Sequence, residues 1–209
     1  MAEGWAFTGG PPNATAGADV TLVEGRSFCV SDRVGDLGGA ATHGLIVQDT
    51  RFVEHLVLTV DGDRLEPLGV EPIGPHAATF VTRRKPRDGL ADSTLLVVRE
   101  RYVGNGLVED ITLENLSRQT EEYTLVLTVS TDFANLFEVK EGRATTGRVV
   151  TSAADAGVIS QATLHPSPRS VVVTGTGEPT TKDGELRWHL DIPPRGRTTC
   201  RSSHCRGAR

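Results

Sequence analysis

The sequence predicts an all-β protein, a β-sandwich of roughly ten to twelve antiparallel strands. Apolar residues recur at every second position in many segments, which is typical of half-buried strands. The 23 glycines and 11 prolines are spread along 209 residues, and this spacing favours short strands joined by turns. The Gly- and Pro-free stretch 107–141 is long enough for a helix, but its apolar residues also keep to period two. These three observations favour strands throughout.

The chain begins with a segment that lacks any period. Residues 1–20 are rich in Gly, Pro, Ala and Thr, and we predict a flexible leader there. The alternation starts near Thr21, and we place the sandwich domain over residues 21–192. Within it, Phe52 to Val60 predicts one extended strand, with Glu54 on the same face as its apolar residues. The Asp61-Gly62 step that follows favours a tight hairpin.

Further strands follow along the domain. Residues 94–115 predict two strands around an Asn-Gly hairpin at 103–106. Tyr123 to Val129 alternates clearly, and Leu186 to Ile192 has the cleanest half-buried pattern in the chain. The other predicted strands cover residues 26–30, 44–48, 78–83, 148–152, 157–163 and 170–175.

The C-terminal segment 193–209 differs from the rest. It contains five arginines, no acidic residue and two of the three cysteines, which leaves 17 basic against 27 acidic residues elsewhere. Neither its charge nor its hydrophobicity resembles the strands before it. We therefore expect a disordered basic tail, or an aberrant, out-of-frame end of an interrupted gene.

Composition excludes several functional classes. The net charge of −5 argues against a general nucleic-acid binder. No apolar run approaches the roughly 18 residues of a membrane helix, so we predict no membrane partner. Three cysteines make no disulfide framework, and residues 1–5 lack the basic and apolar start of a signal peptide. A cytoplasmic location is expected.

The sequence shows no convincing catalytic, metal or cofactor motif. No two of the 27 acidic residues stand out as a paired acid and base. Cys200, His204 and Cys205 offer at most three ligands, fewer than a structural zinc site needs. The glycine clusters are not followed by helices, so a phosphate site is rejected. We predict no catalytic residue, no metal and no cofactor in this chain.

Two segments carry more polar chemistry than strands and turns need. Residues 43–52 place a Gln-Asp-Thr-Arg group between apolar strands, and residues 131–140 interleave two phenylalanines with polar groups. Aromatic rings beside carboxylates and amides are typical of a sugar or partner surface. The alternative is local pairing of Asp49 with Arg51, with both phenylalanines in the core. The candidate binding or interface residues are Asp49, Arg51, Asp132, Phe133, Asn135, Phe137 and Glu138.

These segments also carry a resemblance to a known family. Residues 22–36, 43–52 and 132–140 occur in the order and spacing of the N-terminal domain of bacterial glycogen debranching enzymes of the amylo-α-1,6-glucosidase type. The resemblance covers residues 20 to 195. It departs after Gly196, where another apolar strand would be expected.

The resemblance implies a fold and a role. The family's domain is similar to the β-supersandwich that precedes an (α/α)6 barrel, and the barrel holds the general acid and base. The expected function is therefore a non-catalytic module that supports hydrolysis of α-1,6-glucosidic bonds by a barrel, in cis or in trans. Because the chain ends where the barrel should begin, we expect a fragment or a stand-alone remnant.

Two other functions stay open. A stand-alone carbohydrate-binding module would hold an α-glucan through Phe133, Phe137 and nearby polar groups. A weaker alternative is an enzyme whose carboxylates cannot be paired from sequence.

Overall fold

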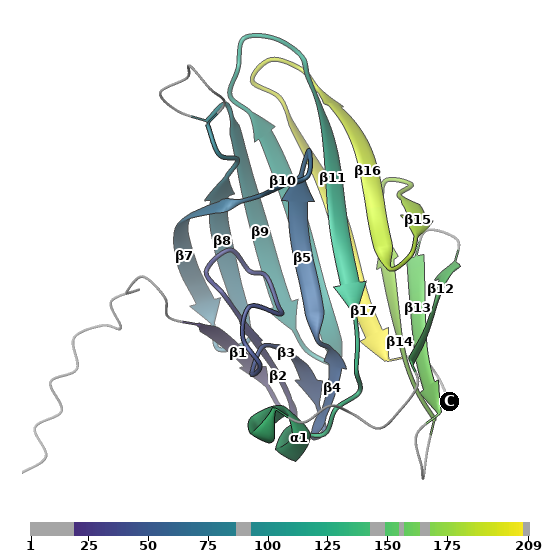
Figure 1. Ribbon diagram of the computed structural model, residues 1–209. Coiled ribbons are helices and arrows are strands. Elements are labelled where there is room, and N and C mark those ends of the chain that lie inside the picture. The colour runs from purple at the N-terminus through teal and green to yellow at the C-terminus, as the bar shows by residue number, and fades with distance from the viewer. Residues whose placement is uncertain (1–18, 87–92, 143–148, 155–156, 164–167, 207–209) are drawn as a thin grey trace, which may run out of the picture.

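The protein is a β-sandwich, as predicted (Figure 1). The computed structural model describes residues 19–86, 93–142, 149–154, 157–163 and 168–206. These residues form 17 strands and one short helix, and the strands make three antiparallel sheets. The strands are more numerous than the ten to twelve expected, partly because β6 and β15 have only two and three residues.

One layer of the sandwich is an eight-stranded sheet in the order β12-β13-β14-β17-β10-β9-β8-β7. Figure 1 shows this sheet behind the five-stranded one. Its strands are β7 (Glu66–Gly74), β8 (Ala77–Arg83), β9 (Leu95–Val103), β10 (Gly106–Asn115), β12 (Val149–Ala154), β13 (Gly157–Thr163), β14 (Pro168–Gly175) and β17 (Arg197–Arg206).

The facing layer combines the two smaller sheets. The five-stranded sheet has the order β15-β16-β11-β5-β6, and the four-stranded sheet runs from β1 to β4. The helix α1 (Leu136–Glu141) follows β11. The strands are β1 (Val20–Glu24), β2 (Ser27–Ser31), β3 (Gly44–Val47), β4 (Thr50–Val53), β5 (His55–Val60), β6 (Asp63–Arg64), β11 (Glu121–Ser130), β15 (Thr180–Lys182) and β16 (Glu185–Ile192).

The stretch predicted as one strand, Phe52 to Val60, is two strands in two different sheets. The chain leaves β4 at Glu54, whose backbone N–H donates to the carbonyl of Ser130 at 3.0 Å, and then enters β5. Both predicted hairpins are confirmed. At the first, Asp61 and Gly62 have φ values of 53° and 85°, as a two-residue hairpin turn with two left-handed positions requires.

The expectation of a disordered C-terminal tail is wrong for residues 197–206. These residues form β17, which pairs with β10 on one side and β14 on the other. Cys200, Ser202 and His204 are buried, while Arg201 points outward to Asp110. Small polar inward residues and ladder hydrogen bonds on both edges therefore replace the expected apolar alternation. Residues 1–18 and 207–209 lie outside the described part, and Val20 already belongs to β1.

The hydrophobic core lies between the two layers. Trp188 is its largest side chain, and its indole N–H donates to the carbonyl of Thr176 at 2.7 Å. The other central residues come from both layers. They include Leu58, Phe80, Val97, Ile111, Leu125 and Phe133. Among the described residues, no helix is long and apolar enough to cross a membrane.

Removing β17 should abolish the fold, because β17 is the strand that joins β14 to β10. We expect a chain that stops after Gly196 to show no cooperative thermal transition by circular dichroism. The control is Thr199→Ala, which removes only an exposed hydroxyl contact with Thr112 and should change stability by about 0.5 kcal/mol or less. A cooperative melt of the shortened chain would contradict this placement of β17.

Candidate functional site

The two polar segments singled out in the sequence meet at one end of the sandwich. The backbone N–H of Arg51 donates to the carbonyl of Ala134 at 2.8 Å, and that of Leu136 donates to the carbonyl of Asp49 at 3.0 Å. These bonds join the β3–β4 turn to the start of α1, which lies beside β4 in Figure 1. We call residues 49–51 together with 132–138 the α1 junction. It contains all seven candidate residues.

Arg51 is the central polar group of the α1 junction. Its side chain is 9% exposed, and its Nε and Nη2 donate to the two carboxylate oxygens of Asp132 at 3.1 and 2.5 Å. Its Nη1 donates to the carbonyls of Ala41 and His43 at 2.7 and 3.1 Å. A Cβ at Gly44 would lie 2.5 Å from the Arg51 Cδ, so the absence of a side chain there makes room for the arginine. Arg51 therefore ties three backbone segments together.

Asn135 and Glu138 are used to begin α1. The Asn135 side chain accepts from the N–H groups of Phe137 and Glu138, each at 3.0 Å. The Glu138 carboxylate accepts from the backbone N–H of Asn135 at 2.8 Å, which completes a capping box. Period-two patterning predicted no helix here, but the Asn-x-x-Glu spacing is a helix-start signal that the sequence does contain.

The two candidate phenylalanines have opposite environments. Phe133 is 1% exposed and packs edge-to-face against Phe52, with ring centroids 5.7 Å apart. It belongs to the core, as the alternative interpretation held, and its ring is not available to a ligand. Phe137 is 71% exposed and Leu136 is 37% exposed, so these neighbours form an apolar tip on α1. Of the two rings, only Phe137 can contact a partner or a sugar.

Two of the three carboxylates of the α1 junction are engaged in structural hydrogen bonds. The carboxylates of Asp132 and Glu138 already accept hydrogen bonds from Arg51 and from the helix start, and Asp49 is exposed beside them. The described residues contain no group of three or more His, Cys, Asp or Glu side chains that could hold a metal ion.

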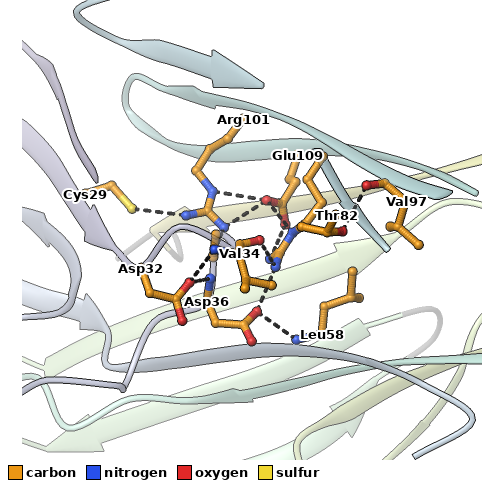
Figure 2. A network of polar contacts seen from close by, with 11 residues as sticks. Cys29, Asp32, Val34, Asp36, Leu58, Thr82, Val97, Arg101 and Glu109 are labelled. Atoms are coloured by element: carbon orange, nitrogen blue, oxygen red, sulfur yellow. Dashed lines mark hydrogen bonds and ion pairs between the residues drawn. The ribbon is translucent and has the colours of Figure 1, made fainter. Parts of the chain in front are cut away.

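A second polar cluster, fully buried, lies on the inner face of the eight-stranded sheet (Figure 2). The Glu109 carboxylate accepts from Nε and Nη2 of Arg99, both at 3.1 Å, and from Nε and Nη2 of Arg101 at 3.1 and 2.8 Å. All three residues have no exposed surface. We call these three residues and Asp36 the buried arginine network.

The two arginines also hold the loop between β2 and β3. Nη1 of Arg99 donates to the Asp36 carboxylate at 2.7 Å and to the carbonyl of Val34 at 3.0 Å. Nη2 of Arg101 donates to the carbonyl of Gly35. The loop carbonyls thus accept hydrogen bonds from arginine N–H groups, in addition to those that Glu109 accepts. These bonds hold the loop against the sheet.

Asp36 carries the connection on to the other layer. Its Oδ1 accepts from the backbone N–H of Leu58 in β5 at 3.1 Å. Asp32 shapes the loop itself, since its Oδ1 accepts from the N–H groups of Val34 and Asp36 at 2.9 and 2.8 Å. The buried arginine network therefore links both layers of the sandwich.

The ionisation of this cluster follows from its contacts. Burial opposes the charge of Glu109, but Arg101 and Arg99 outweigh it and lower the pKa of its carboxyl to about 2. Burial lowers the pKa of His204, which faces this cluster, to about 4, and burial also raises the pKa of the Cys29 thiol. Glu109 is thus a fixed anion near neutral pH, and His204 and Cys29 are neutral, so the cluster suits structure rather than acid–base catalysis.

The period-two alternation of the sequence does not predict this network. Arg99 and Arg101 lie on the same buried face of β9 as Leu95, Val97 and Val103. Two charged residues therefore occupy a face that is otherwise apolar. Two arginines on the apolar face of one predicted strand, together with Glu109 on the apolar face of the next strand, are the sequence signal of this network.

Known structures share this fold at low sequence identity. The chain aligns with a protein described as an aldose 1-epimerase from Escherichia coli K12 (TM-score 0.53, 8% identity, 91% of this chain and 99% of that one). It also aligns with a galactose mutarotase related enzyme from Lactobacillus acidophilus (TM-score 0.54, 9% identity, 91% and 98%). The third is described as a kojibiose phosphorylase from the human microbiome (TM-score 0.53, 8% identity), of which the alignment covers 23%, against 79% of this chain.

The fold is therefore the β-sandwich of aldose epimerase-like proteins. The family model for the N-terminal domain of some glycogen debranching enzymes matches residues 22–202. The chain belongs to that family. No curated protein matches it.

Arg51 and Asp49 should differ sharply in their contribution to stability. Arg51→Ala would leave a half-buried carboxylate and two carbonyls without their donors, so we expect a loss of about 2–4 kcal/mol in the free energy of unfolding. Asp49→Ala removes an exposed side chain and should cost about 0.5 kcal/mol or less. Urea denaturation measures both. Equal, small losses would show that Arg51 is not a structural tie.

His204 should make the fold sensitive to mild acid. Its pKa is lower in the folded state than its ordinary value of 6.5, so the unfolded chain binds more protons and stability falls as the pH drops from about 6.5 to about 4. The expected loss is about 3 kcal/mol. Glu109, with its lowered pKa, adds a further loss from about 4.5 downward.

Urea denaturation between pH 4 and 8 separates the two groups. His204→Asn should flatten the part of the stability curve above pH 4.5 and leave the steeper acid part in place. Parallel curves for the variant and the native chain would show that His204 does not carry this pH dependence.

Proposed function

We propose that the chain is a non-catalytic N-terminal module of a debranching-type glycosidase. In this role it supports an (α/α)6 barrel that hydrolyses α-1,6-glucosidic bonds, in the same chain or in another, and it releases no sugar itself. The family match over residues 22–202 carries the proposal. The cytoplasmic location stays a prediction of the sequence.

The polar groups of the α1 junction and the buried network support a role without chemistry. A glycosidase needs two carboxyl groups that flank the bond, one of them able to give a proton. Asp132 is bound by Arg51, Glu138 is part of a helix cap, and Glu109 is buried between two arginines. Each of these carboxylates is held by a structural partner.

Phe137 and Leu136 are our candidates for contact with the rim of the barrel. They project from a helix whose start is fixed by the capping box and by backbone bonds to the β3–β4 turn. A rigidly held apolar tip of this kind loses little conformational entropy when it binds.

Hydrolysis of a glycogen limit dextrin tests the proposal. The purified chain alone should release no glucose, and adding it to a purified (α/α)6 domain of a glycogen debranching enzyme should raise the activity or thermal stability of that domain. Glucose release by the chain alone, above a heat-treated control, would refute the non-catalytic role. No effect on the barrel domain would refute the supporting role.

A second candidate function rests on the exposed ring of Phe137. A stand-alone α-glucan-binding module would stack this ring on a glucose unit. Affinity electrophoresis in glycogen tests this, with Phe137→Ala compared with Ile73→Ala, a change at another exposed apolar side chain, on β7. If the module binds glucan through α1, only Phe137→Ala should remove the retardation. Unretarded native protein would exclude this function.

A further inference from the structure

The two edge strands of the eight-stranded sheet are protected very differently. The sheet runs from β12 to β7, and Figure 1 shows these strands at opposite margins of the sandwich. An edge strand exposes unpaired N–H and C=O groups, which proteins usually block with prolines, charges or bulges. β7 has all three, since it contains Pro67, Pro72, Glu66 and Glu71 and its register shifts beside both prolines. β7 is therefore a poor template for another strand.

β12 has none of these devices. Its sequence, Val149–Ala154, contains no proline and no charged residue. It pairs with β13 in regular register over its whole length. Among the described residues, its backbone makes one further hydrogen bond, at its end, where the carbonyl of Ala154 accepts from the hydroxyl of Thr181 at 3.1 Å. Within the described part of the chain, the outer edge of β12 is therefore open from Val149 to Ala153.

The other four sheet edges in the described part are short or already occupied. β6 and β15 have only two and three residues. Along β1, the N–H of Val23 donates to the carbonyl of Pro75 at 2.6 Å. Along β4, the N–H of Arg51 donates to the carbonyl of Ala134 in the α1 junction. Of the edges described, β12 alone has both the length and the exposure to accept another strand.

The core also stops short at β12. Thr151 and Ala153 lie on the inner face of the sheet, because they pair with Ser160 and Val158 of β13. These two partners are 2% and 1% exposed. Thr151 and Ala153 are themselves exposed, since no strand lies beyond them in the described sheet. A further strand beside β12 would cover these two side chains as well as the open backbone groups.

We propose that two copies of the chain pair through β12, so that their large sheets join into one continuous antiparallel sheet. A twofold axis perpendicular to the sheet makes the two β12 strands antiparallel and keeps both inner faces on one side. With this axis at Thr151, Val149 lies opposite Ala153 of the second copy. On the outer face, Val150 lies opposite Ser152 of the second copy.

A second copy suits this edge for two reasons. No charge meets its own counterpart across the axis, and the facing residues are small or β-branched, which suits paired strands. The register also ends before Ala154, whose carbonyl is already bound. A strand of another protein fits less well, because β12 has no charged or large side chain by which to select it. A sugar fits less well because β12 has no aromatic ring.

Sedimentation equilibrium of the intact chain tests the pairing. The double variant Val150→Lys, Ser152→Lys places lysines opposite one another on both sides of the axis, and like charges on paired residues oppose pairing. We expect the dissociation constant of the dimer to rise by about tenfold or more. The control is Leu68→Lys, Ile73→Lys, which adds the same two charges at exposed apolar positions of β7 and should leave the constant nearly unchanged.

Hydrogen exchange of the native chain needs no variant. As the concentration of the chain is raised, amides of residues 149–153 should exchange more slowly, because those that point outward become hydrogen-bonded. Amides of residues 66–74, on the protected edge, should keep their rates. If circular dichroism shows that the double variant is unfolded, this measurement decides alone.

Three outcomes would overturn the proposal. One is a native chain that stays monomeric at every concentration. Another is a dimer that survives the double variant and leaves exchange of β12 unchanged, since it would use a different surface. The third is slower exchange of β12 with a purified (α/α)6 domain but not at raised concentration, which would favour a strand of the barrel. Glucose release from a limit dextrin is a separate measurement, so failure here leaves the proposed function standing.

Discussion

A carboxylate with no access to water is the constraint around which this sandwich is arranged. Glu109 sits on the inner face of the large sheet, where an unpaired charge would cost several kcal/mol. Arg99 and Arg101 neutralise it, but they bring one positive charge and several N–H donors too many. Asp36 and the carbonyls of Val34 and Gly35 supply the remaining partners. The loop between β2 and β3 must therefore close over the sheet for the charges to be balanced.

The α1 junction also contains a buried charge that needs several hydrogen-bond partners. Arg51 is also buried, and its planar group of donors is divided between the carboxylate of Asp132 and the carbonyls of Ala41 and His43. An arginine suits both places because its donors are fixed in a plane and can satisfy several acceptors at once. In each case a buried arginine holds an irregular segment against a strand.

A strand can be predicted from the sequence where the polarity of its side chains alternates with the backbone, and it cannot where this alternation is lost. The alternation of Leu186, Trp188 and Leu190 defined a strand because the inward residues are apolar. β17 could not be found in this way because its inward residues include Ser202 and His204. The two polar segments contact each other through Arg51, and this contact depends on a long-range pairing that spacing alone does not reveal. Phe133 and Phe137 could not be distinguished, since burial was decided by the turn before α1.

The place of β17 in the large sheet also determines when the sheet can be completed during synthesis. The sheet consists of one group, β12 to β14, and another, β7 to β10, and β17 is the strand between them. It is also the last strand in chain order, so during synthesis each group leaves the ribosome with an unpaired edge facing the other. The sheet closes only when residues 197–206 emerge. Until then each group has an unpaired edge strand, and unpaired edges favour pairing between chains.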